Sequence, residues 1–388
     1  MSYDLAVVGA GVAGSVAAYH AAKKGLKVVL LEKERLPRHK LCGGAVTEKT
    51  VNLLKSLGIT PDKQSLGLEI GNVKVKIPGA EKSTKISSGK IYTTYRSIFD
   101  NFLAMKAQEA GAELFQDTFV RSIDTGTSPV LHIRGGDEIR ADYIIGGDGF
   151  YSLVAREAKL RESFPKNQLA IAAEYEIKGN FDIDAMEIHF GRSSFSYSWI
   201  FPKEDGVTIG VAELGSRLKG SIRDYLDNFV KAQTFLDGTK LPVSESFAIP
   251  MGGIKRVVAN DRVALAGDAA GFVDPLSGEG IYYAALSGYL AAETVKSALQ
   301  GGSLKDYQKA TDREILPDLK ALLRIAKLFY LSLGFSYYLF EESDILQNIV
   351  TLLAGDRVRP RDFYRDSLIF SVRKFPSYIL KNVIHLFQ

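Results

Sequence analysis

The stretch YDLAVVGAGVAGSVAAYHAAKKGLKVVLLEKE, residues 3–34, decides the fold. Residues 5–8 form a continuous apolar run, which is typical of a buried parallel strand. A helix is predicted over 12–24 and a second strand over 27–31. The loop before the helix has GxGxxG spacing and the second strand ends in a carboxylate: Gly9, Gly11, Gly14 and Glu32. Such glycines let a pyrophosphate approach the helix N-terminus, and the carboxylate accepts ribose hydroxyls, so the stretch predicts a dinucleotide-binding unit.

The composition of the chain is that of an ordinary globular protein. It has 388 residues, of which 46% are hydrophobic and 24% charged, and its net charge of +4 is too small to indicate nucleic-acid binding. Cys42 is the only cysteine, which excludes an intrachain disulfide or a cysteine-ligated cluster and favours a reducing, cytoplasmic setting. We expect no signal peptide and no membrane-spanning helix, because the first residues form a strand and no apolar run is long enough.

Two later segments distinguish FAD from a nicotinamide dinucleotide. A Gly-Asp pair follows an apolar strand in each of them, at 147–148 and at 267–268. Asp268 can accept a hydrogen bond from a ribityl hydroxyl, and a helix that opens near Gly280 can stabilise an electron-rich flavin ring. Either pair alone is read as a turn, but the two pairs in this order predict bound FAD.

Four segments carry a resemblance to a known family: KLCGGAV (40–46), YRSIFDNFLAMKAQEAGAEL (95–114), SYSWIFPKEDGVTIGV (196–211) and GDAAGFVDPLSGEGIYYAALSG (267–288). Over about residues 1–300 the sequence resembles the FAD fold of the p-hydroxybenzoate hydroxylase type and, within it, the geranylgeranyl reductase family, above all its archaeal members. The resemblance implies an oxidoreductase that uses hydride from reduced FAD plus a proton to saturate isolated double bonds of polyprenyl (geranylgeranyl) chains on lipids or quinones. Ser194 departs from the family pattern, which usually has a proline there, and this bears on the shape of the substrate pocket.

The resemblance also implies which residues contact the cofactor. Besides the glycines of the loop, they are Ala13, Glu32, Cys42, Gly43, Ala45, Arg96, Val120, Asp268, Gly280 and Ile281. Arg96 can donate two hydrogen bonds to the pyrophosphate, and the backbone of Val120 can meet adenine. Cys42 precedes two glycines that let the backbone approach a flat ring, so its thiol is expected beside the flavin. A direct redox role for Cys42 is not expected, because no second thiol is present.

Three aromatic residues alternate along SYSWIFP: Tyr197, Trp199 and Phe201. Period two puts them on one face of a strand, and a turn at 202–206 leads into a second strand. One interpretation is the core face of an antiparallel sheet. The other is the wall of an apolar tunnel over the flavin, where aromatic faces stabilise a developing cation. On the second interpretation Cys42, Tyr197 and Trp199 are the catalytic candidates, and the proton comes from Tyr197, Cys42 or an ordered water.

The expected fold is mixed α/β with three domains. They are a Rossmann-like FAD-binding domain (1–60, 92–160 and 253–300), an inserted antiparallel-sheet catalytic domain (61–91 and 161–252) and a helical C-terminal domain (301–388). From Tyr307 the tail is helical and apolar, and later basic. It either packs against the body of the protein or lies on anionic lipid, which would make the protein peripheral on the cytoplasmic membrane face.

Two other functions stay open on the sequence. A flavin monooxygenase or halogenase of the same fold would add oxygen or halogen to its substrate, and a non-catalytic prenyl-binding or electron-transfer flavoprotein would leave a lipid unchanged. The electron donor is expected to be a reduced ferredoxin-like protein or NAD(P)H that binds transiently, because no second GxGxxG motif is found.

Overall fold

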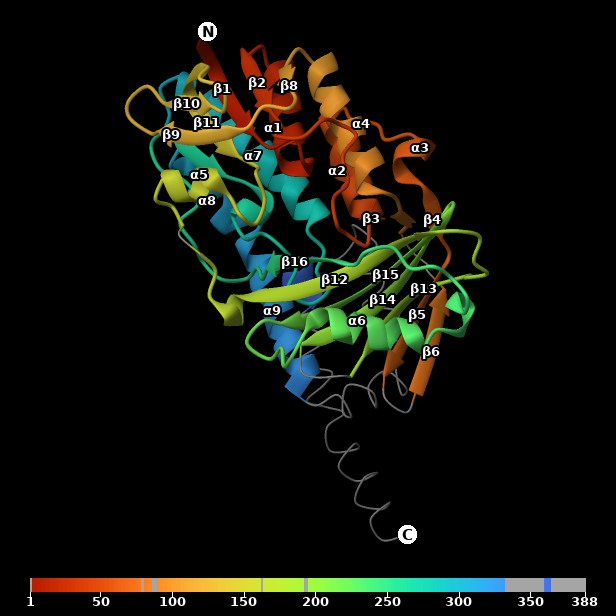
Figure 1. Ribbon diagram of the computed structural model, residues 1–388. Coiled ribbons are helices and arrows are strands. Elements are labelled where there is room, and N and C mark those ends of the chain that lie inside the picture. Colours follow the sequence, from red (N-terminus) through yellow and green to blue (C-terminus); the bar gives the residue numbers. More distant parts are fainter. Residues whose placement is uncertain are drawn as a thin grey trace, which may run out of the picture.

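The computed structural model describes residues 2–77, 80–85, 89–161, 163–191, 195–331 and 359–363. The described chain forms one sheet with its helices around the N-terminus, at the top of Figure 1, and a second large sheet below it. Ser194 and most of the apolar and basic tail lie outside the described residues.

The upper sheet has the strand order β8-β2-β1-β11-β10-β9, with β17 paired to the end of β11. Strands β9 and β10 form an antiparallel extension, whereas β8, β2, β1, β11 and β17 run parallel. Residues 5–8 and all of β2 are buried, which explains their uninterrupted apolar sequence. The bounds are β1 Ser2–Val8, β2 Val28–Leu31, β8 Glu113–Phe115, β9 Val120–Asp124, β10 Val130–Ile133, β11 Glu138–Gly146 and β17 Val263–Leu265.

Helix α1 packs against α4 and α7. The crossing of α1 and α7 is close because small residues meet there: a Cβ atom on Gly288 would lie 2.2 Å from the carbonyl oxygen of Ala13. This contact brings the glycine loop before α1 next to the start of α7. The bounds of the helices are α1 Val12–Lys23, α2 Glu48–Leu57, α3 Lys63–Leu66, α4 Arg96–Glu109, α5 Leu153–Glu157, α7 Ile281–Leu299, α8 Asp306–Glu314 and α9 Leu316–Leu331.

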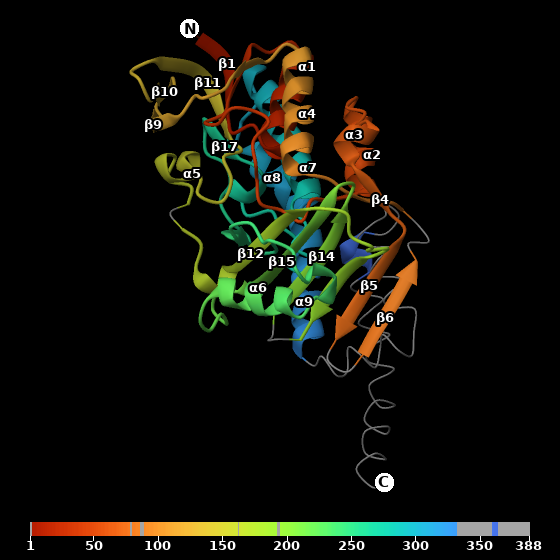
Figure 2. The same ribbon diagram turned by 45° about the vertical axis from the view of Figure 1, so that its right-hand side comes forward.

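The lower sheet has the order β16-β12-β15-β14-β13-β5-β6 and is antiparallel except for the pair β13–β5. We call it the catalytic sheet. Helix α6, Ile222–Lys231, covers one of its faces, as Figure 2 shows, and buries Leu226 against Ile209 and its neighbours. The strand bounds are β5 Asn72–Ile77, β6 Ala80–Lys85, β12 Leu169–Lys178, β13 Met186–Phe190, β14 Ser196–Lys203, β15 Gly206–Leu214 and β16 Glu245–Pro250.

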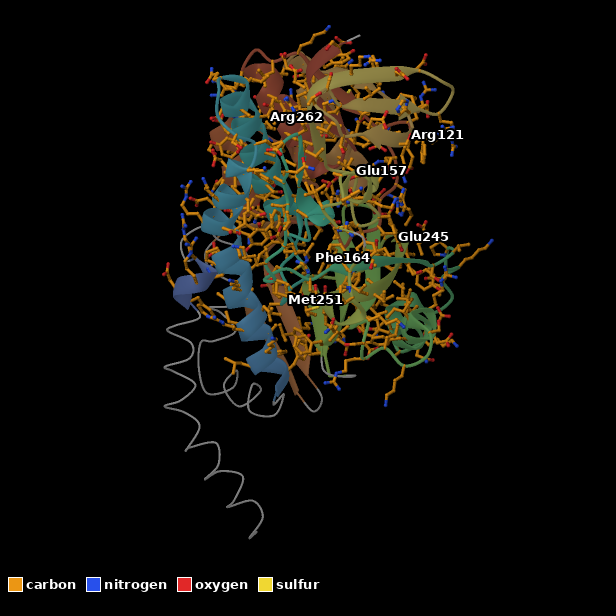
Figure 3. The ribbon with its side chains drawn as sticks, turned by 90° about the vertical axis from the view of Figure 1, so that its left-hand side faces the viewer. Arg121, Glu157, Phe164, Glu245, Met251 and Arg262 are labelled. Carbon is orange, nitrogen blue, oxygen red and sulfur yellow. The ribbon has the colours of Figure 1, made fainter. Side chains whose placement is uncertain are left out.

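The other face of the catalytic sheet meets α9 and a small sheet that links the two regions. Phe329 and Tyr330 near the end of α9 pack in one cluster with Val73 and Ile188, and Figure 3 shows this helix in blue beside the strands. The small sheet has the order β3-β7-β4, with β3 at Ala45–Thr47, β4 at Leu68–Ile70 and β7 at Ile91–Thr93.

The expected fold class is confirmed. The chain has a Rossmann-like sheet, a largely antiparallel sheet whose strands come from residues 72–85 and 169–250, and helices toward the C-terminal side. The residue boundaries of the three domains stay a prediction. Among the described residues, no helix combines the length and the apolar character that crossing a bilayer requires.

Candidate active site

Four parallel strands of the upper sheet end at one edge, and each is followed by a residue that the sequence singled out. Gly9 follows β1, Glu32 follows β2, Gly147 follows β11 and Gly267 lies two residues after β17. Ligands of open α/β sheets bind outside the carboxyl ends of such strands. The arrangement therefore brings the glycine loop and both Gly-Asp pairs to one edge.

Two of the three glycines in the loop, Gly9 and Gly14, are packed so closely that a side chain cannot replace them. A Cβ on Gly14 would lie 1.8 Å from the carbonyl oxygen of Gly9. Gly9 has a φ of +95°, which side chains disfavour, and a Cβ there would lie 2.6 Å from the carbonyl oxygen of Gly147. A Cβ on Gly11 would meet nothing closer than an Arg38 nitrogen at 3.8 Å. The space beside Gly11 is thus the space that a bound pyrophosphate needs, and the loop fits FAD.

Glu32 is buried at the end of β2 and is held from two sides. Its Oε2 accepts from the backbone N–H of Ala10 at 2.8 Å and pairs with the Arg38 guanidinium at 3.3 Å. Arg38 also pairs with Asp100, at 3.2 Å. The ribose-binding carboxylate predicted from the sequence is therefore positioned by an arginine that the sequence reasoning missed.

Arg96 begins α4 and lies beside the same acidic group. Its guanidinium donates to both carboxylate oxygens of Asp100, at 2.7 and 2.9 Å. Burial alone would lower the pKa of Arg96, but the Asp100 carboxylate and the Cys42 thiol outweigh burial and raise it. Arg96 is thus a fixed cation beside Cys42 that lines the cavity described next.

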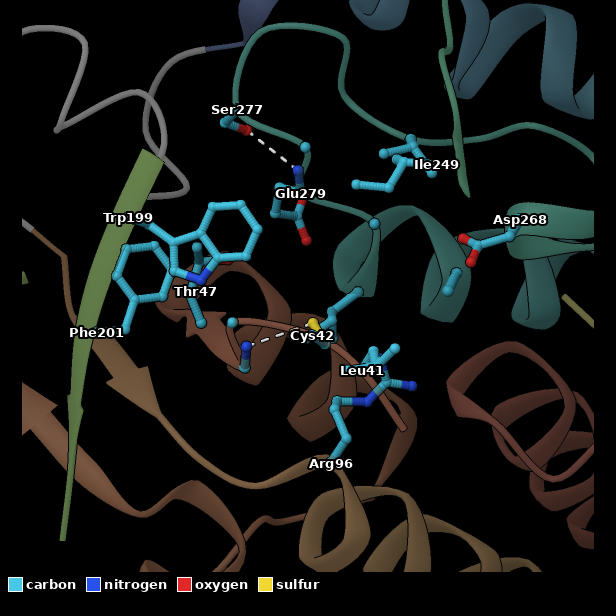
Figure 4. A pocket seen from close by; sticks show the side chains of 18 of the residues that line it. Leu41, Cys42, Thr47, Arg96, Trp199, Phe201, Ile249, Asp268, Ser277 and Glu279 are labelled. Carbon is cyan, nitrogen blue, oxygen red and sulfur yellow. Dashed lines mark hydrogen bonds between the residues drawn. The ribbon is translucent and has the colours of Figure 1, made fainter. Parts of the chain in front are cut away.

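A cavity of about 270 Å³ lies between the edge of the upper sheet and the catalytic sheet, and Figure 4 shows part of it. The predicted site residues that line it are Gly11, Ala13, Cys42, Gly43, Ala45, Arg96, Tyr197, Trp199, Asp268, Gly280 and Ile281. The predicted residues outside this lining are Gly9, Gly14, Glu32 and Val120. The first three support the loop as described above, whereas Val120 is the buried first residue of β9. The role of each residue toward FAD stays a prediction.

The turn at residues 42–44 enters the cavity from the side of the small sheet. The Sγ atom of Cys42 accepts from the backbone N–H of Gly44 at 3.3 Å, and in Figure 4 it points toward the space between Trp199 and Asp268. Gly44 has a φ of +71°, and a Cβ there would lie 2.0 Å from the carbonyl oxygen of Thr94. The glycines therefore fix where the thiol stands.

Two buried titratable residues of the catalytic sheet reach this turn. Glu174 on β12 accepts from the backbone N–H of Cys42 at 2.6 Å. Lys203, the last residue of β14, donates to the carbonyl oxygens of Gly43 at 2.6 Å and Thr94 at 2.8 Å. Burial raises the pKa of Glu174 to about 8 and lowers the pKa of Lys203 to about 8.

The three aromatic residues of β14 form one row on the cavity side of the sheet, as their alternation predicted. Ring centroids are 5.6 Å apart between Tyr197 and Trp199 and 6.3 Å apart between Trp199 and Phe201. A Cβ on Gly43 would lie 2.7 Å from Phe201 and 3.3 Å from the Trp199 indole nitrogen. The row therefore packs directly against the 42–44 turn.

The loop before α7 closes the far side of the cavity. The Tyr197 hydroxyl donates to the carbonyl oxygen of Ser277 at 3.1 Å. Gly280 and Ile281 stand at the N-terminus of α7, where the helix carries partial positive charge. Asp268 lines the cavity, with the Lys40 ammonium 3.9 Å from its carboxylate. Asp148 of the other Gly-Asp pair instead accepts from Ser152 and from the backbone of Val154 at the start of α5.

Sequence reasoning missed four charged residues of this site: Arg38, Lys40, Glu174 and Lys203. The first two precede the cysteine in RHKLCGG (38–44). Positive charge in a segment that is expected near a phosphate was a signal that could have found them. Glu174 interrupts the apolar start of β12, but its partner lies 132 residues away in sequence. Glu174 and Cys42 come together only in the folded structure.

Comparison with known proteins shows the family of the chain. The sequence matches the FAD binding domain family over residues 2–324. It is 33% identical to digeranylgeranylglycerophospholipid reductase 2 of Methanothermobacter thermautotrophicus, over 84% of this chain and 88% of that protein. It is 32% identical to digeranylgeranylglycerophospholipid reductase 1 of Methanopyrus kandleri, over 84% and 91%.

Solved structures share the fold. A geranylgeranyl bacteriochlorophyll reductase-like protein of Thermoplasma acidophilum has a TM-score of 0.79 at 23% identity and covers 98% of both chains. A flavin-dependent brominase has a TM-score of 0.76 at 21% identity, covering 96% of this chain and all of that one (100%).

The fold and the cavity define an FAD-binding oxidoreductase. More particularly, the chain belongs to the FAD binding domain family and, within it, to the family of the digeranylgeranylglycerophospholipid reductases. The resemblance seen in the sequence motifs and the expected FAD cofactor are thereby confirmed.

Proposed function

We propose that this protein is an FAD-dependent reductase that saturates isolated carbon–carbon double bonds of polyprenyl chains, of the geranylgeranyl type, on lipids or quinones. The names of the relatives support a geranylgeranyl lipid as the substrate class. The observation that carries the proposal is an apolar extension of the cavity beside the 42–44 turn.

This extension leads from the 42–44 turn toward the strands and helix at the lower end of the molecule. The side chains that line it come from β5, β13 and α9: Val73, Val75, Met186, Ile188, Phe190, Ile325 and Phe329. A wall of aliphatic and aromatic side chains suits a branched hydrocarbon chain and offers little to a polar substrate. It supports a substrate whose reacting bond lies within a long apolar tail.

FAD, when bound and reduced, supplies a hydride. An isolated alkene has no neighbouring carbonyl to absorb charge. The protein therefore has to provide a proton donor and surroundings that tolerate positive charge on carbon. The faces of Tyr197 and Trp199 offer the second, and the apolar lining excludes water that would trap a cation.

Cys42 is the favoured proton donor of the three candidates. Tyr197 already donates its hydroxyl proton to the carbonyl of Ser277, and burial together with the charges of Asp274, Cys42 and Glu174 raises its pKa. A phenol whose pKa is raised is a poorer acid. The Cys42 thiol, by contrast, faces the cavity and stands beside the Arg96 side chain.

The electron donor and the place of substrate uptake belong to the same proposal. We infer a reduced ferredoxin-like protein or NAD(P)H as a transient donor, because the chain has one dinucleotide-binding motif. A lipid-tailed substrate has to be collected from a bilayer or a carrier, which favours peripheral contact with the cytoplasmic face of the membrane.

The experiment is reduction of defined lipids by the FAD-loaded protein with dithionite as electron source. Geranylgeranylated glycerophospholipid and a polyprenyl quinone are incubated separately, and products are weighed by mass spectrometry. Gains of two hydrogens per reduced bond are expected. A product that carries oxygen, or halogen when bromide is supplied, would favour the monooxygenase or halogenase alternative, for which the shared fold with a brominase is the present support.

A further inference from the structure

We propose that Glu174 and Lys203 are positioning residues that clamp the 42–44 turn to the catalytic sheet and so hold the Cys42 thiol in the cavity. The inference rests on the proposed function for the purpose of this thiol, but the clamp itself can be tested without any lipid. Neither side chain lines the cavity, so both act through the turn.

The clamp holds the turn at two peptide groups, the one that joins residues 41 and 42 and the one that joins residues 43 and 44. Glu174 accepts the N–H of Cys42 at 2.6 Å and Lys203 donates to the carbonyl of Gly43 at 2.6 Å, so the thiol-bearing residue is held on both sides. The second Lys203 bond, to Thr94 at 2.8 Å, ties the turn to the segment just before α4. Both side chains are buried, with exposed fractions of 1% for Glu174 and 5% for Lys203.

The register of the sheet connects the clamp to the aromatic row. Glu174 pairs with Gly210, and Gly210 pairs with Trp199, so the three stand in one line across β12, β15 and β14. Lys203 follows Phe201 by two positions on β14. A substrate chain that rests on Trp199 and Phe201 therefore touches the strand that positions Cys42.

The buried carboxyl is suited to holding a peptide N–H without a full negative charge. Burial raises the pKa of Glu174 to about 8, against the opposing effects of the Cys42 N–H and Lys203, which favours the protonated carboxyl at neutral pH. The second carboxyl oxygen, Oε2, is buried and has no hydrogen-bond partner among the described residues. Removing the carboxyl or the ammonium thus leaves backbone groups of the turn unpaired in a dry place.

Other titratable groups face the pair and have to be considered. The charges of Glu176 on β12 and Glu245 on β16 raise the pKa of Glu174. On Lys203, Glu176 raises the pKa and Lys178, also on β12, lowers it. Cys42 acts on Lys203 from the turn, and the Tyr197 phenol on β14 feels the charge of Glu174. The pKa values of both clamp residues lie at about 8, so the pair is expected to lose a proton near that pH.

The test uses the fact that Cys42 is the only cysteine, so thiol alkylation reports this turn alone. Iodoacetamide is reacted with FAD-loaded wild type, Glu174→Gln, Glu174→Leu and Lys203→Met at pH values on either side of 8. Glu174→Leu and Lys203→Met should speed alkylation at least about tenfold, as expected when a local opening becomes easier. Glu174→Gln keeps an acceptor for the Cys42 N–H and should stay within about twofold of wild type at neutral pH, a rescue that bulk packing loss would not give.

Glu213→Gln is the matched control, because Glu213 is a buried carboxylate of the same sheet, on β15 opposite Ser196, with an exposed fraction of 3%. It should leave the alkylation rate unchanged. Equal rates for wild type, Glu174→Leu and Lys203→Met would overturn the clamp, as would the same acceleration in Glu213→Gln. If the Leu and Met variants do not fold, Glu174→Gln still decides: the clamp predicts that wild-type alkylation changes with pH near 8 more than alkylation of a free thiol does, and Glu174→Gln should lack this extra change. The same pH dependence in both proteins would overturn the clamp. Failure of lipid reduction with the clamp intact would instead count against the proposed function.

Discussion

The indole of Trp199 lies flat over Gly210, the residue opposite it on the neighbouring strand. A Cβ at Gly210 would stand 2.0 Å from the Cζ2 atom of the indole. The indole therefore occupies the place where a side chain of β15 would project, and Gly210 lets it reach toward the 42–44 turn. This pair decides the shape of the cavity wall above the thiol.

Replacing Gly210 with alanine should push the indole away from the turn. We expect turnover to fall by about a hundredfold, the scale of a misplaced group near the reacting atoms, while FAD stays bound. Alanine is no worse than glycine in a strand, so the fold should persist. Turnover by lipid mass spectrometry and bound flavin by absorbance are the measurements. Ala212→Gly, on the same face two residues on, is the control, and normal turnover in Gly210→Ala would contradict the role of the indole.

Gly11 and Gly14 separate cofactor binding from folding. A Cβ on Gly11 meets no protein atom closer than 3.8 Å, so Gly11→Val should fold, yet its side chain would occupy the space for a pyrophosphate. We expect purified Gly11→Val to hold less than about a tenth of the wild-type FAD with unchanged circular dichroism. Gly14→Ala, whose Cβ meets Gly9 at 1.8 Å, should in addition lower the melting temperature. Full flavin content in Gly11→Val would mean that the pyrophosphate of the cofactor does not bind beside Gly11.

Cys42 and Tyr197 should differ as proton donors. Cys42→Ala is expected to lower the single-turnover rate about a hundredfold, the usual contribution of a positioned acid. Tyr197→Phe removes a hydroxyl that already donates to the carbonyl oxygen of Ser277, and this variant should retain at least about a tenth of the rate. Both rates are followed by reoxidation of bound reduced flavin on adding lipid. The reverse order would move the proton to Tyr197, and equal small effects would favour an ordered water.

Glu174 should make the protein less stable as pH rises. Its folded pKa of about 8 lies above the ordinary value of 4.5, so between these two pH values the folded state holds a proton that the unfolded state has released. Stability contributed by this carboxyl is complete below pH 4.5 and is lost as pH rises toward 8. Glu174→Gln should therefore gain melting temperature relative to wild type on going from pH 5 to pH 8. Parallel melting curves for the two proteins across this range would disprove the raised pKa.

Local patterns predicted much of the nucleotide-binding region. The apolar run at 5–8, the glycine loop and Glu32 belong to one short segment, so their geometry follows from neighbours in sequence. The alternation of Tyr197, Trp199 and Phe201 likewise gave their common face. Such features depend on backbone periodicity, which a sequence carries directly.

The contacts between regions could not be predicted in the same way. Glu174 meets Cys42, and Lys203 meets Gly43, across more than a hundred residues, because the catalytic sheet folds back onto the turn. Asp148 looked equivalent to Asp268 in sequence, but it is bonded at the start of α5 and only Asp268 lines the cavity. Which of two similar motifs faces a ligand depends on packing that periodicity does not encode.

The central claim is reduction of an isolated polyprenyl double bond, and deuterium incorporation tests it most directly. The FAD-loaded protein, reduced with dithionite in deuterated water, is given geranylgeranylated glycerophospholipid, and the product is examined by mass spectrometry and deuterium NMR. The account predicts two deuterium atoms per reduced bond, one on each former alkene carbon. A lipid recovered with its double bonds intact while the flavin is reoxidised, or a product that carries oxygen, would contradict it.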